Sequence, residues 1–366
     1  MKKRKIVIIG SGPAGIATAL SLRQISPHLA SEVVILEREK HPRHKLCGGG
    51  LTPYADEILA TLGVRSKVPS FPIHKVRFYF ENRPVHFLRK DMMRVVRRDE
   101  FDADLVYQAR AAGITILERQ NVVDVRRSHD GLEVATERGT FYPRVIVGAD
   151  GANSLVRKKM IAEKRSRVSR LMEVLVRVDP TQTQEFAENM AVLDFRPARY
   201  DLQGYLWNFP SLIQGQAYLN IGIFDSRIHG DRRAKLREFL TERLRNRGLL
   251  NENITFMGHP ERWFSPKGRY ACPNVLLVGD AAGIEPWLGE GISTALAYGP
   301  VAAEAVKKAF ENDDFSFATY PKLVLKSRLG RFLRRNRIIA KYFYNRRIQS
   351  LLPLIAKGWE TYFNLS

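Results

Sequence analysis

Cysteine is scarce in this sequence: only two residues, Cys47 and Cys272, are found among 366. Two cysteines cannot build a disulfide framework, and no cysteine–histidine spacing typical of a metal site accompanies them. An iron–sulfur cluster held by four cysteines is excluded by the same count. We therefore expect no metal, and we expect a reducing, cytosolic compartment.

Long apolar runs are also missing. The N-terminal segment MKKRKIVIIG begins like a secretion signal, with basic residues ahead of an apolar run, but that run, Ile6–Ile9, is only four residues long. No window approaches the roughly 20 apolar residues that a membrane-spanning helix needs. We therefore expect neither a targeting signal nor a transmembrane segment.

Acidic residues are few relative to basic ones. Lys and Arg number 59 against 38 Asp and Glu, which gives a net charge of +21. From residue 322 onward there are eleven Lys and Arg and a single acid, Glu360, so this segment alone carries +10. Such an excess indicates a polyanionic partner, either nucleic acid or an anionic membrane surface. Because no recognised nucleic-acid-binding motif accompanies the charge, the membrane surface is favoured.

The sequence begins with a strong nucleotide-binding pattern. A short aliphatic run, Lys5–Ile9, leads into the glycine turn GSGPAG at residues 10–15 and then into a helix-like segment, Ile16–Gln24. A second predicted strand, 32–36, ends at Glu37. The first glycine permits the tight turn, the second lets the backbone approach a pyrophosphate, and the third allows close helix–strand packing. Glu37 is placed to accept hydrogen bonds from ribose hydroxyls, which predicts NAD or FAD rather than a nucleotide with a 2′-phosphate.

Two later strand ends decide between these cofactors. The runs VIVGADG (145–151) and VLLVGD (275–280) contain Asp150 and Asp280 at their ends, and an RDEFD segment beginning at Arg98 precedes both. A nicotinamide dehydrogenase has no need of two more nucleotide-facing strand ends so far apart, whereas a large cofactor that spans the domain does. FAD is therefore the expected cofactor. Taken alone, Arg98 is equally a solvated residue of a basic run, and Asp150 an ordinary strand-ending residue.

Taken in order, the motifs GxGxxG, RxxFD, DG and GD resemble the FAD-binding set of the aromatic-hydroxylase-type flavoproteins. Two further motifs, KLCGGG (45–50) and YLWNFP (205–210, read as YxWxFP), resemble the geranylgeranyl reductase family, which reduces isolated double bonds in polyprenyl chains. The resemblance extends to about residue 320. It implies an α/β fold: a Rossmann-like three-layer FAD-binding domain, a substrate domain built on an antiparallel sheet, and a basic helical C-terminal tail.

The resemblance also divides the chain and assigns residues. The FAD-binding domain is expected to comprise 1–70, 95–165 and 270–320, the substrate domain 71–94 and 166–269, and the tail 321–366. The residues implied to bind FAD are Gly10, Gly12, Pro13, Ala14, Gly15, Glu37, Arg38, Lys45, Cys47, Gly48, Gly49, Arg98, Val123, Asp150, Asp280, Gly289, Gly291 and Ile292. Those implied to line the substrate pocket are Gly49, Gly50, Tyr205, Trp207, Phe209, Pro210 and Pro286. The implied catalytic residues are Cys47, Tyr205 and Trp207.

The role of Cys47 stays open. Three consecutive glycines do not favour the interior of a helix or strand, but backbone without Cβ atoms suits the close approach of a flat ring or a lipid chain. Saturating an unactivated alkene with a hydride leaves the second carbon in need of a proton. Cys47 either donates that proton or only shapes the pocket, and a water held by Tyr205 is another source. A thiol with an ordinary pKa of about 8.5 is a weak acid for this step.

The middle of the chain favours an antiparallel sheet. Alternating or aliphatic patterns predict strands at 76–80, 171–178, 191–195 and 216–224. In the YxWxFP motif, Tyr205, Trp207 and Phe209 alternate onto one face of a further strand. The same pattern is typical of ordinary sheet core, and the family resemblance favours a pocket wall instead. Later, 292–307 reads as a helix whose N-terminal dipole would stabilise negative charge on a reduced flavin.

The sequence thus predicts an FAD-dependent reductase of polyprenyl double bonds, with NADPH, NADH or a ferredoxin as reductant. Because a polyprenyl substrate is dissolved in the bilayer, we expect a cytoplasmic protein, peripheral on the inner face of the membrane. The segment 331–347 interleaves apolar and basic residues and is either the docking element or a helix that merely covers the FAD-binding domain. The alternative function is an FAD-dependent monooxygenase or halogenase of the same fold, acting on a small aromatic or lipophilic substrate.

Overall fold

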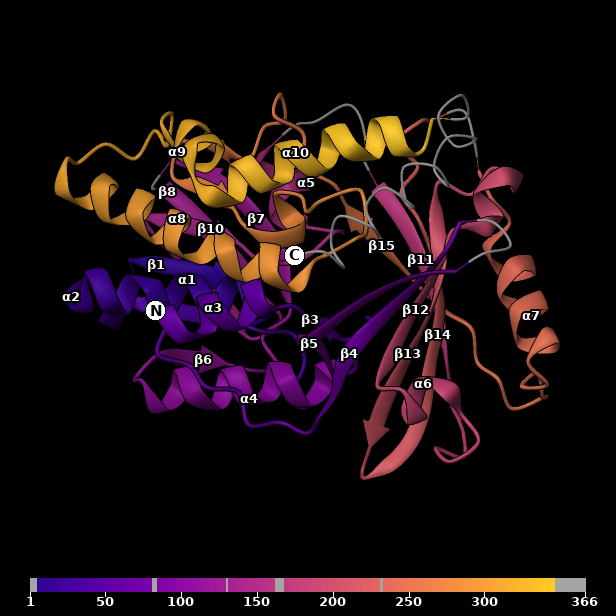
Figure 1. The fold of residues 1–366 in the computed structure, drawn as a ribbon. Helices are drawn as coiled ribbons and strands as arrows, with labels where there is room; N and C mark the ends of the chain where they lie inside the picture. Colours follow the sequence, from indigo (N-terminus) through magenta and orange to yellow (C-terminus); the bar gives the residue numbers. More distant parts are fainter. Residues whose placement is uncertain (1–4, 81–83, 130, 162–167, 231–232, 346–366) are drawn as a thin grey trace.

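In the computed structural model, which describes residues 5–80, 84–129, 131–161, 168–230 and 233–345, two large sheets are joined by helices (Figure 1). A six-stranded sheet has the order β16-β17-β10-β1-β2-β6, and all neighbouring strands are parallel except β16 and β17. Its strands are β1 Ile6–Ile9, β2 Val33–Leu36, β6 Thr115–Leu117, β10 Val145–Gly148, β16 Ala271–Cys272 and β17 Val275–Leu277. Strands β1, β2, β10 and β17 are buried along their whole length, as their unbroken aliphatic sequences predict.

Helices and a small second sheet enclose this parallel sheet. Helix α1 packs on α8 and α4, while α5 packs on β7 of a three-stranded antiparallel sheet, β7-β8-β9. All of them share one hydrophobic core with the parallel strands, which confirms the Rossmann-like three-layer fold. The bounds are α1 Pro13–Ile25, α2 Pro27–Ser31, α3 Pro53–Thr61, α4 Arg98–Ala111, α5 Leu155–Met160, α8 Ile292–Glu311, β7 Val122–Ser128, β8 Gly131–Thr136 and β9 Gly139–Phe141.

The second large sheet is the antiparallel sheet that the sequence predicts (Figure 1). Its order is β15-β11-β14-β13-β12-β4-β5-β3, and the β12–β4 pair is parallel while the others are antiparallel. Helix α7 covers one face, because Leu236, Leu240 and Leu244 recur every fourth residue and are buried against the sheet. The bounds are β3 Gly50–Leu51, β4 Ser70–Tyr79, β5 Pro84–Val96, β11 Val168–Arg177, α6 Gln184–Ala187, β12 Met190–Asp194, β13 Gly204–Ile213, β14 Gln216–Asp225, α7 Leu236–Asn246 and β15 Met257–Arg262.

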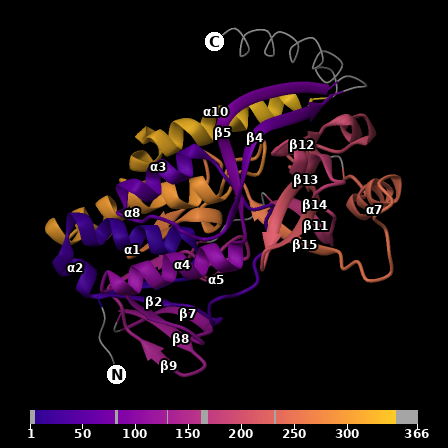
Figure 2. The same cartoon turned by 60° about the horizontal axis from the view of Figure 1, so that its bottom comes forward.

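Two C-terminal helices, α9 (Tyr320–Lys326) and α10 (Arg328–Phe343), lead from α8 to the antiparallel sheet (Figures 1 and 2). At the far end of α10, Phe343 packs against Phe195 and Phe80 with ring centroids 5.2 and 6.2 Å apart. The predicted helical tail is confirmed this far, and its remainder, 346–366, lies outside the described residues. Among the described residues, no helix combines the length and apolar character needed to span a bilayer.

The crossing of α1 and α8 depends on a glycine. At Gly299 a Cβ atom would lie 2.5 Å from the backbone carbon of Ala17. We expect Gly299→Ala to lower the free energy of unfolding by about 1–3 kcal/mol, because the two helices must move apart. Urea denaturation followed by circular dichroism measures the change. Gly230→Ala is the control, since a Cβ there meets nothing within 4 Å; equal stability of the two variants would contradict the close crossing.

Candidate functional site

The glycine turn after β1 leaves room for a ligand on one side only. Gly10 has a φ of +104°, and a Cβ there would overlap the carbonyl oxygen of Ala149. A Cβ on Gly15 would overlap the carbonyl oxygen of Gly10. The first and third glycines are therefore needed for close packing within the protein, whether or not a ligand binds. At Gly12 a Cβ would meet only Nη2 of Arg43, 3.7 Å away. The second glycine therefore faces open space at the start of α1, as a pyrophosphate cradle requires.

Glu37, at the end of β2, is held as a carboxylate beside this turn. Ser11 donates to its Oε2 from the backbone N–H at 3.0 Å and from the hydroxyl at 2.7 Å. Nε of Arg43 lies 3.6 Å from the same oxygen. Burial opposes the charge, but Arg43 and the Ser11 hydrogen bonds outweigh it and hold the pKa of Glu37 below its usual value. The predicted ribose-binding acid is therefore ionised and fixed at the edge of the cradle.

Arg43 is a basic residue of this site that the sequence does not single out, because it is one of four Lys and Arg between residues 38 and 45. Its Nη2 lies 3.3 Å from Oδ2 of Asp102. Asp102 also accepts two hydrogen bonds of 2.9 Å from Arg98. Arg98 is buried, so its interpretation as a solvated residue of a basic run is wrong. Arg43 thus lies between Glu37 and Asp102, so the two guanidinium groups are balanced by two carboxylates. Their N–H groups, rather than an excess of charge, suit a pyrophosphate.

The ends of strands β10 and β17, which are followed by Asp150 and Asp280, are tied to each other. Oδ2 of Asp150 accepts the backbone N–H of Val156 at 3.0 Å, whereas its Oδ1 is buried without a hydrogen-bond partner. A buried oxygen without a donor is unfavourable in the protein alone, and a ligand hydroxyl supplies such a donor. Nε of Arg157 donates to the carbonyl of Ala281 at 2.7 Å and so ties the first strand end to the second. Asp280 lies in that second turn, the 3₁₀ helix Gly279–Ala281.

Glu285 shapes the loop that leads into α8. Its carboxylate accepts the backbone N–H groups of Trp287, Leu288 and Glu290 at 2.7, 2.8 and 2.7 Å. Burial raises the pKa of Glu285 to about 7, although these N–H groups act in the opposite direction. The loop closes around this carboxyl group and places Gly291 at the N-terminus of α8, where the helix dipole favours negative charge.

Three hydroxyls from other elements hold the same loop. The carbonyls of residues 286, 287 and 288 accept hydrogen bonds of 2.5 Å from Ser226, Tyr344 and Tyr205, respectively. Ser226 follows β14, Tyr344 follows α10 and Tyr205 lies in β13, so three separate elements fix one loop. The Tyr205 hydroxyl, expected as the holder of a water, donates to the loop instead. Sequence reasoning missed Ser226 and Tyr344, whose partners lie 60 and 57 positions away.

The glycine turn after Cys47 lies directly on the YxWxFP strand. A Cβ on Gly48 would lie 3.1 Å from Cδ2 of Phe209 and 3.3 Å from Nε1 of Trp207. Gly49 has a φ of +79°, a conformation that favours glycine. Residues 44–49 belong to no helix or strand, as predicted, and β3 begins at Gly50. The two motifs that carry the family resemblance are therefore in contact.

Hydrogen bonds fix the Cys47 backbone to the sheet. Nε1 of Trp207 donates to Oδ1 of Asn220 at 2.8 Å, and Nδ2 of Asn220 donates to the carbonyl of Cys47 at 3.2 Å. The Cys47 N–H donates to Oε1 of Glu173 at 3.2 Å. Burial raises the pKa of the Cys47 thiol, and the nearby Arg98 only partly opposes this effect. The thiol therefore keeps its proton at neutral pH.

Tyr205, Trp207 and Phe209 form a row along one face of β13, called here the aromatic row. Successive ring centroids are 6.2 and 6.3 Å apart, and the predicted alternation on a strand is confirmed. Pro210 is the next residue in the strand and therefore lies on the opposite face, the one that α7 covers. Alternation thus places Pro210 away from the pocket wall that was expected to include it.

The remaining predicted residues are divided between the interior and the surface. Nζ of Lys45 lies 2.6 Å from Nε2 of His259, and burial lowers the pKa of Lys45. Burial and the neighbouring Lys45 lower the pKa of His259 to about 3, so the imidazole is neutral and accepts from the ammonium. Arg38 is 74% exposed and pairs with Glu39 at 3.6 Å. Val123 is 49% exposed at a bulge of β7, so neither Arg38 nor Val123 contacts the cradle through a buried side chain.

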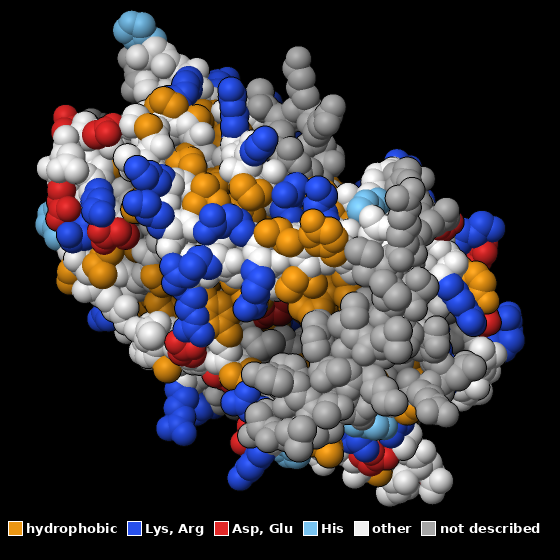
Figure 3. Space-filling view, turned by 45° about the horizontal axis from the view of Figure 1, so that its top comes forward, with side chains coloured by type: hydrophobic (Ala, Val, Ile, Leu, Met, Phe, Trp, Pro, Cys, Tyr) orange, Lys and Arg blue, Asp and Glu red, His pale blue; other side chains and the backbone are white. Residues whose placement is uncertain are grey.

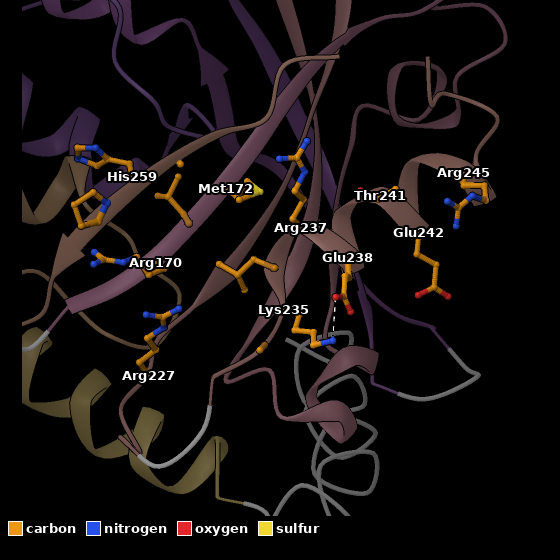
Figure 4. A pocket seen from close by; sticks show the side chains of 15 residues that line it. Arg170, Met172, Arg227, Lys235, Arg237, Glu238, Thr241, Glu242, Arg245 and His259 are labelled. Carbon is orange, nitrogen blue, oxygen red and sulfur yellow. Dashed lines mark ion pairs between the residues drawn. The ribbon is translucent and has the colours of Figure 1, made fainter. Parts of the chain in front are cut away.

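A hollow of about 940 Å³ lies between α7 and strands β11 and β15 (Figure 4). Its side chains include Arg170, Arg227 and Arg245 together with Glu238 and Glu242. None of the three predicted catalytic residues lines it. Charged side chains surround this hollow, although much of its lining is apolar. It lies beside α7 at the β11–β15 edge of the sheet, and no residue of the aromatic row lines it.

A family model described as FAD binding domain matches residues 3–298. Among curated relatives, the digeranylgeranylglycerophospholipid reductase of Thermoplasma acidophilum is 26% identical over 363 residues, with 92% of this chain and 86% of the relative covered. The menaquinone reductase of Mycolicibacterium smegmatis is 28% identical over 321 residues, covering 82% of this chain and 75% of the relative.

Solved structures share the fold. A geranylgeranyl bacteriochlorophyll reductase-like protein from Thermoplasma acidophilum superposes with a TM-score of 0.75 at 22% identity, covering 94% of this chain and 88% of the other. A probable FAD-dependent monooxygenase from Pseudomonas aeruginosa gives 0.68 at 18% identity, with 94% and 96% covered. At these identities the likeness extends to the fold alone.

The open side of Gly12 can be tested directly. A Cβ there meets only one side-chain nitrogen at 3.7 Å, so Gly12→Ala is expected to fold with unchanged stability. The added methyl group occupies the cradle, and we expect FAD affinity to fall at least about tenfold, or roughly 1.4 kcal/mol. Flavin absorbance of the purified protein and FAD titration of the apoprotein measure this. Undiminished FAD binding would show that the pyrophosphate lies elsewhere.

Proposed function

Since the chain belongs to the family of flavoproteins with this FAD binding domain, we propose that it is an FAD-dependent reductase that saturates carbon–carbon double bonds of a polyprenyl lipid. The contact of the Cys47–Gly50 turn with the aromatic row carries this proposal, because it sets apolar walls beside the expected cofactor loop. The relatives named as reductases of a digeranylgeranyl lipid and of menaquinone support the same substrate class.

The residues present fit FAD. The turn 10–15, with Arg43 and Arg98 behind it, would hold the pyrophosphate, and Glu37 would hold the ribose of the adenosine half. The unpartnered Oδ1 of Asp150 suits a cofactor hydroxyl, and Asp280 is expected to serve the ribityl side. The backbone of 289–292, at the start of α8, would meet the ring. When bound and reduced, FAD supplies the hydride for the reaction.

The chain's own residues position the substrate and exclude water. Tyr205 and Trp207 are only 7% and 4% exposed, so the aromatic row is shielded from water. The Tyr205 hydroxyl holds the loop at Leu288, which keeps the cofactor loop and the substrate wall at a fixed separation. Cys47 shapes the slot from the side of the glycine turn and keeps its thiol proton there.

The substrate class places the reaction at a membrane. Transfer of a five-carbon isoprene unit out of water is worth roughly 4 kcal/mol, at about 0.8 per carbon, so a polyprenyl lipid stays dissolved in the bilayer. The exposed face of α10 suits contact with such a surface, because Ile338 and Tyr342 are 56% and 63% exposed. Exposed basic residues lie beside them, and Figure 3 shows basic and apolar side chains interleaved on this face. The basic side chains are those of Arg331, Arg334, Arg335 and Lys341.

The reductant and the cellular location are part of the same proposal. NADPH, NADH or a ferredoxin would reduce the flavin. A basic helix face is attracted to anionic lipids, which are abundant on the cytoplasmic leaflet, so the protein would act from the cytoplasm on the inner face of the membrane. In this proposal the FAD-binding domain holds the cofactor, the substrate domain lines the lipid site and the tail docks on the membrane.

A monooxygenase or halogenase is the second candidate function. The likeness in fold to a probable FAD-dependent monooxygenase favours it, and the FAD-binding residues serve both reactions equally. The glycine turn packed on the aromatic row favours the reductase instead. Consumption of oxygen coupled to product would identify the monooxygenase or halogenase, since alkene saturation requires no oxygen.

The proposed reductase activity is tested by measuring the masses of the lipid products. Enzyme reduced under strict anaerobiosis is incubated with geranylgeranyl lipids that differ in headgroup, and the products are analysed by mass spectrometry. We expect mass gains in steps of two hydrogens, because each saturated double bond takes up one hydride and one proton. A protein that binds FAD and leaves every geranylgeranyl lipid unchanged, yet converts an aromatic compound when oxygen is admitted, would contradict the reductase.

The proposed docking of the exposed face of α10 on a membrane is tested by measuring binding to vesicles. Replacing Arg335 and Lys341 by glutamine should weaken binding to vesicles containing phosphatidylserine roughly 30-fold, at about 1 kcal/mol per basic residue. A matched pair, Arg23→Gln with Lys67→Gln, removes the same charge from exposed positions in α1 and after α3. Cosedimentation compares both with the unaltered protein. Equal weakening by the two pairs would show that α10 has no special part in docking.

A further inference from the structure

Glu261 lies in β15, at the edge of the antiparallel sheet. Its register partner in β11 is Ser169, and alternation along β11 puts Ser169 on the same face as Leu171 and Glu173. Glu173 accepts the backbone N–H of Cys47, so this face looks onto the glycine turn and the FAD-binding domain. The Glu261 side chain therefore belongs to the layer between the cofactor and the substrate wall.

The carboxyl group of Glu261 reaches the cofactor loop. A Cβ on Gly289, which has a φ of +69°, would lie 2.9 Å from Oε2 of Glu261 and 2.8 Å from Cε2 of Phe224. Phe224 packs in turn on Tyr205, with ring centroids 5.8 Å apart. Oε2 of Glu261 is buried and has no hydrogen-bond partner. An unsatisfied carboxyl oxygen thus lies where the loop, the sheet and the expected ring converge.

The surroundings of Glu261 favour its neutral form. Burial raises its pKa well above the usual value, and the carboxyl groups of Asp280, Glu285 and Glu173 act in the same direction. Lys45 opposes them, but its ammonium group lies 2.6 Å from the imidazole of His259. Cys47 and Tyr205 also face this region, and both are neutral at pH 7 because burial raises the pKa of each. Burial and the neighbouring carboxyl groups therefore favour the protonated form of Glu261.

The other proton donors near the aromatic row are poorer. Burial raises the pKa of the Cys47 thiol, which weakens an acid that is feeble even in water. The Tyr205 hydroxyl donates to the carbonyl of Leu288 and holds the loop in place. The Glu261 carboxyl group differs from the Tyr205 hydroxyl in that its Oε2 has no hydrogen-bond partner, so it is not committed to a loop carbonyl.

We infer that Glu261 is a catalytic residue of this site, the acid that gives the alkene its proton; this inference rests on the proposed reductase function. A hydride adds to one carbon of the double bond. The π electron pair forms the second new C–H bond with the Glu261 proton, and the electron pair of the broken O–H bond stays on the carboxylate. Water then returns a proton to Glu261, so one solvent hydrogen enters the product for each double bond reduced.

Glu261→Gln removes the acid and keeps the size of the side chain. We expect at least about a 100-fold lower rate of alkene reduction, because general acids contribute typically 10²–10⁴. FAD content and the rate at which dithionite bleaches the flavin should be unchanged. Glu242→Gln is the matched control, since Glu242 is an exposed glutamate of α7 on the far side of the sheet. Its rate should equal that of the unaltered enzyme.

Two further measurements separate an acid from a structural residue. The acid acts only when protonated, so the rate of the unaltered enzyme should fall as pH rises through the raised pKa of Glu261, and this fall should vanish in Glu261→Gln. Infrared difference spectra at neutral pH should show the carbonyl band of a protonated carboxyl group that Glu261→Gln loses. An unchanged rate and pH profile in Glu261→Gln, with the rate lost in Cys47→Ser instead, would overturn the inference.

Failure of the proposed reductase function can be distinguished from failure of the inference about Glu261. An unaltered enzyme that binds FAD but saturates no polyprenyl lipid would refute the reductase. The infrared band then decides the protonation of Glu261 without any turnover: its absence from the unaltered protein would overturn the inference by itself.

Discussion

A turn without Cβ atoms lies against a row of aromatic rings, and the rest of the site depends on that contact. Any side chain on Gly48 would push the turn away from Trp207 and Phe209, because a Cβ there already lies within 3.3 Å of both. The close approach allows Asn220 to join the Trp207 indole to the Cys47 carbonyl. The glycine turn and the aromatic row are therefore one rigid unit, and their separation is set by backbone rather than by flexible side chains.

The loop of residues 285–291, which is expected to meet the cofactor, is fixed relative to the glycine turn and the aromatic row. Hydroxyls from three elements bind successive loop carbonyls, while Glu285 gathers the loop N–H groups. Since Tyr344 follows α10, the helix whose outer face carries the basic and apolar side chains is hydrogen-bonded to the cofactor loop. The surface proposed to dock on a membrane is thus connected to the proposed cofactor loop through one short hydrogen-bonded path.

Local patterns in the sequence predicted the parts of the structure that local physics determines. The buried strands, the glycine turn, Glu37 and the alternation of the aromatic row follow from hydrophobicity, glycine conformation and side-chain period, and the structure has each of them. Arg43, Tyr344 and Glu261 could not be found in this way, because each acquires its role only when distant elements meet. Pro210 was placed in the pocket by its motif, although the period of the strand already assigns it to the other face.

The central claim concerns where the isoprenoid chain lies, and a crystal structure with FAD and a geranylgeranyl lipid tests it most directly. The account predicts electron density for the chain along the side of the unit formed by the Cys47–Gly50 turn and the aromatic row, with a double bond facing the loop that contains Gly289. Density for the chain in the hollow between α7 and β15, away from that unit and from the loop, would contradict it.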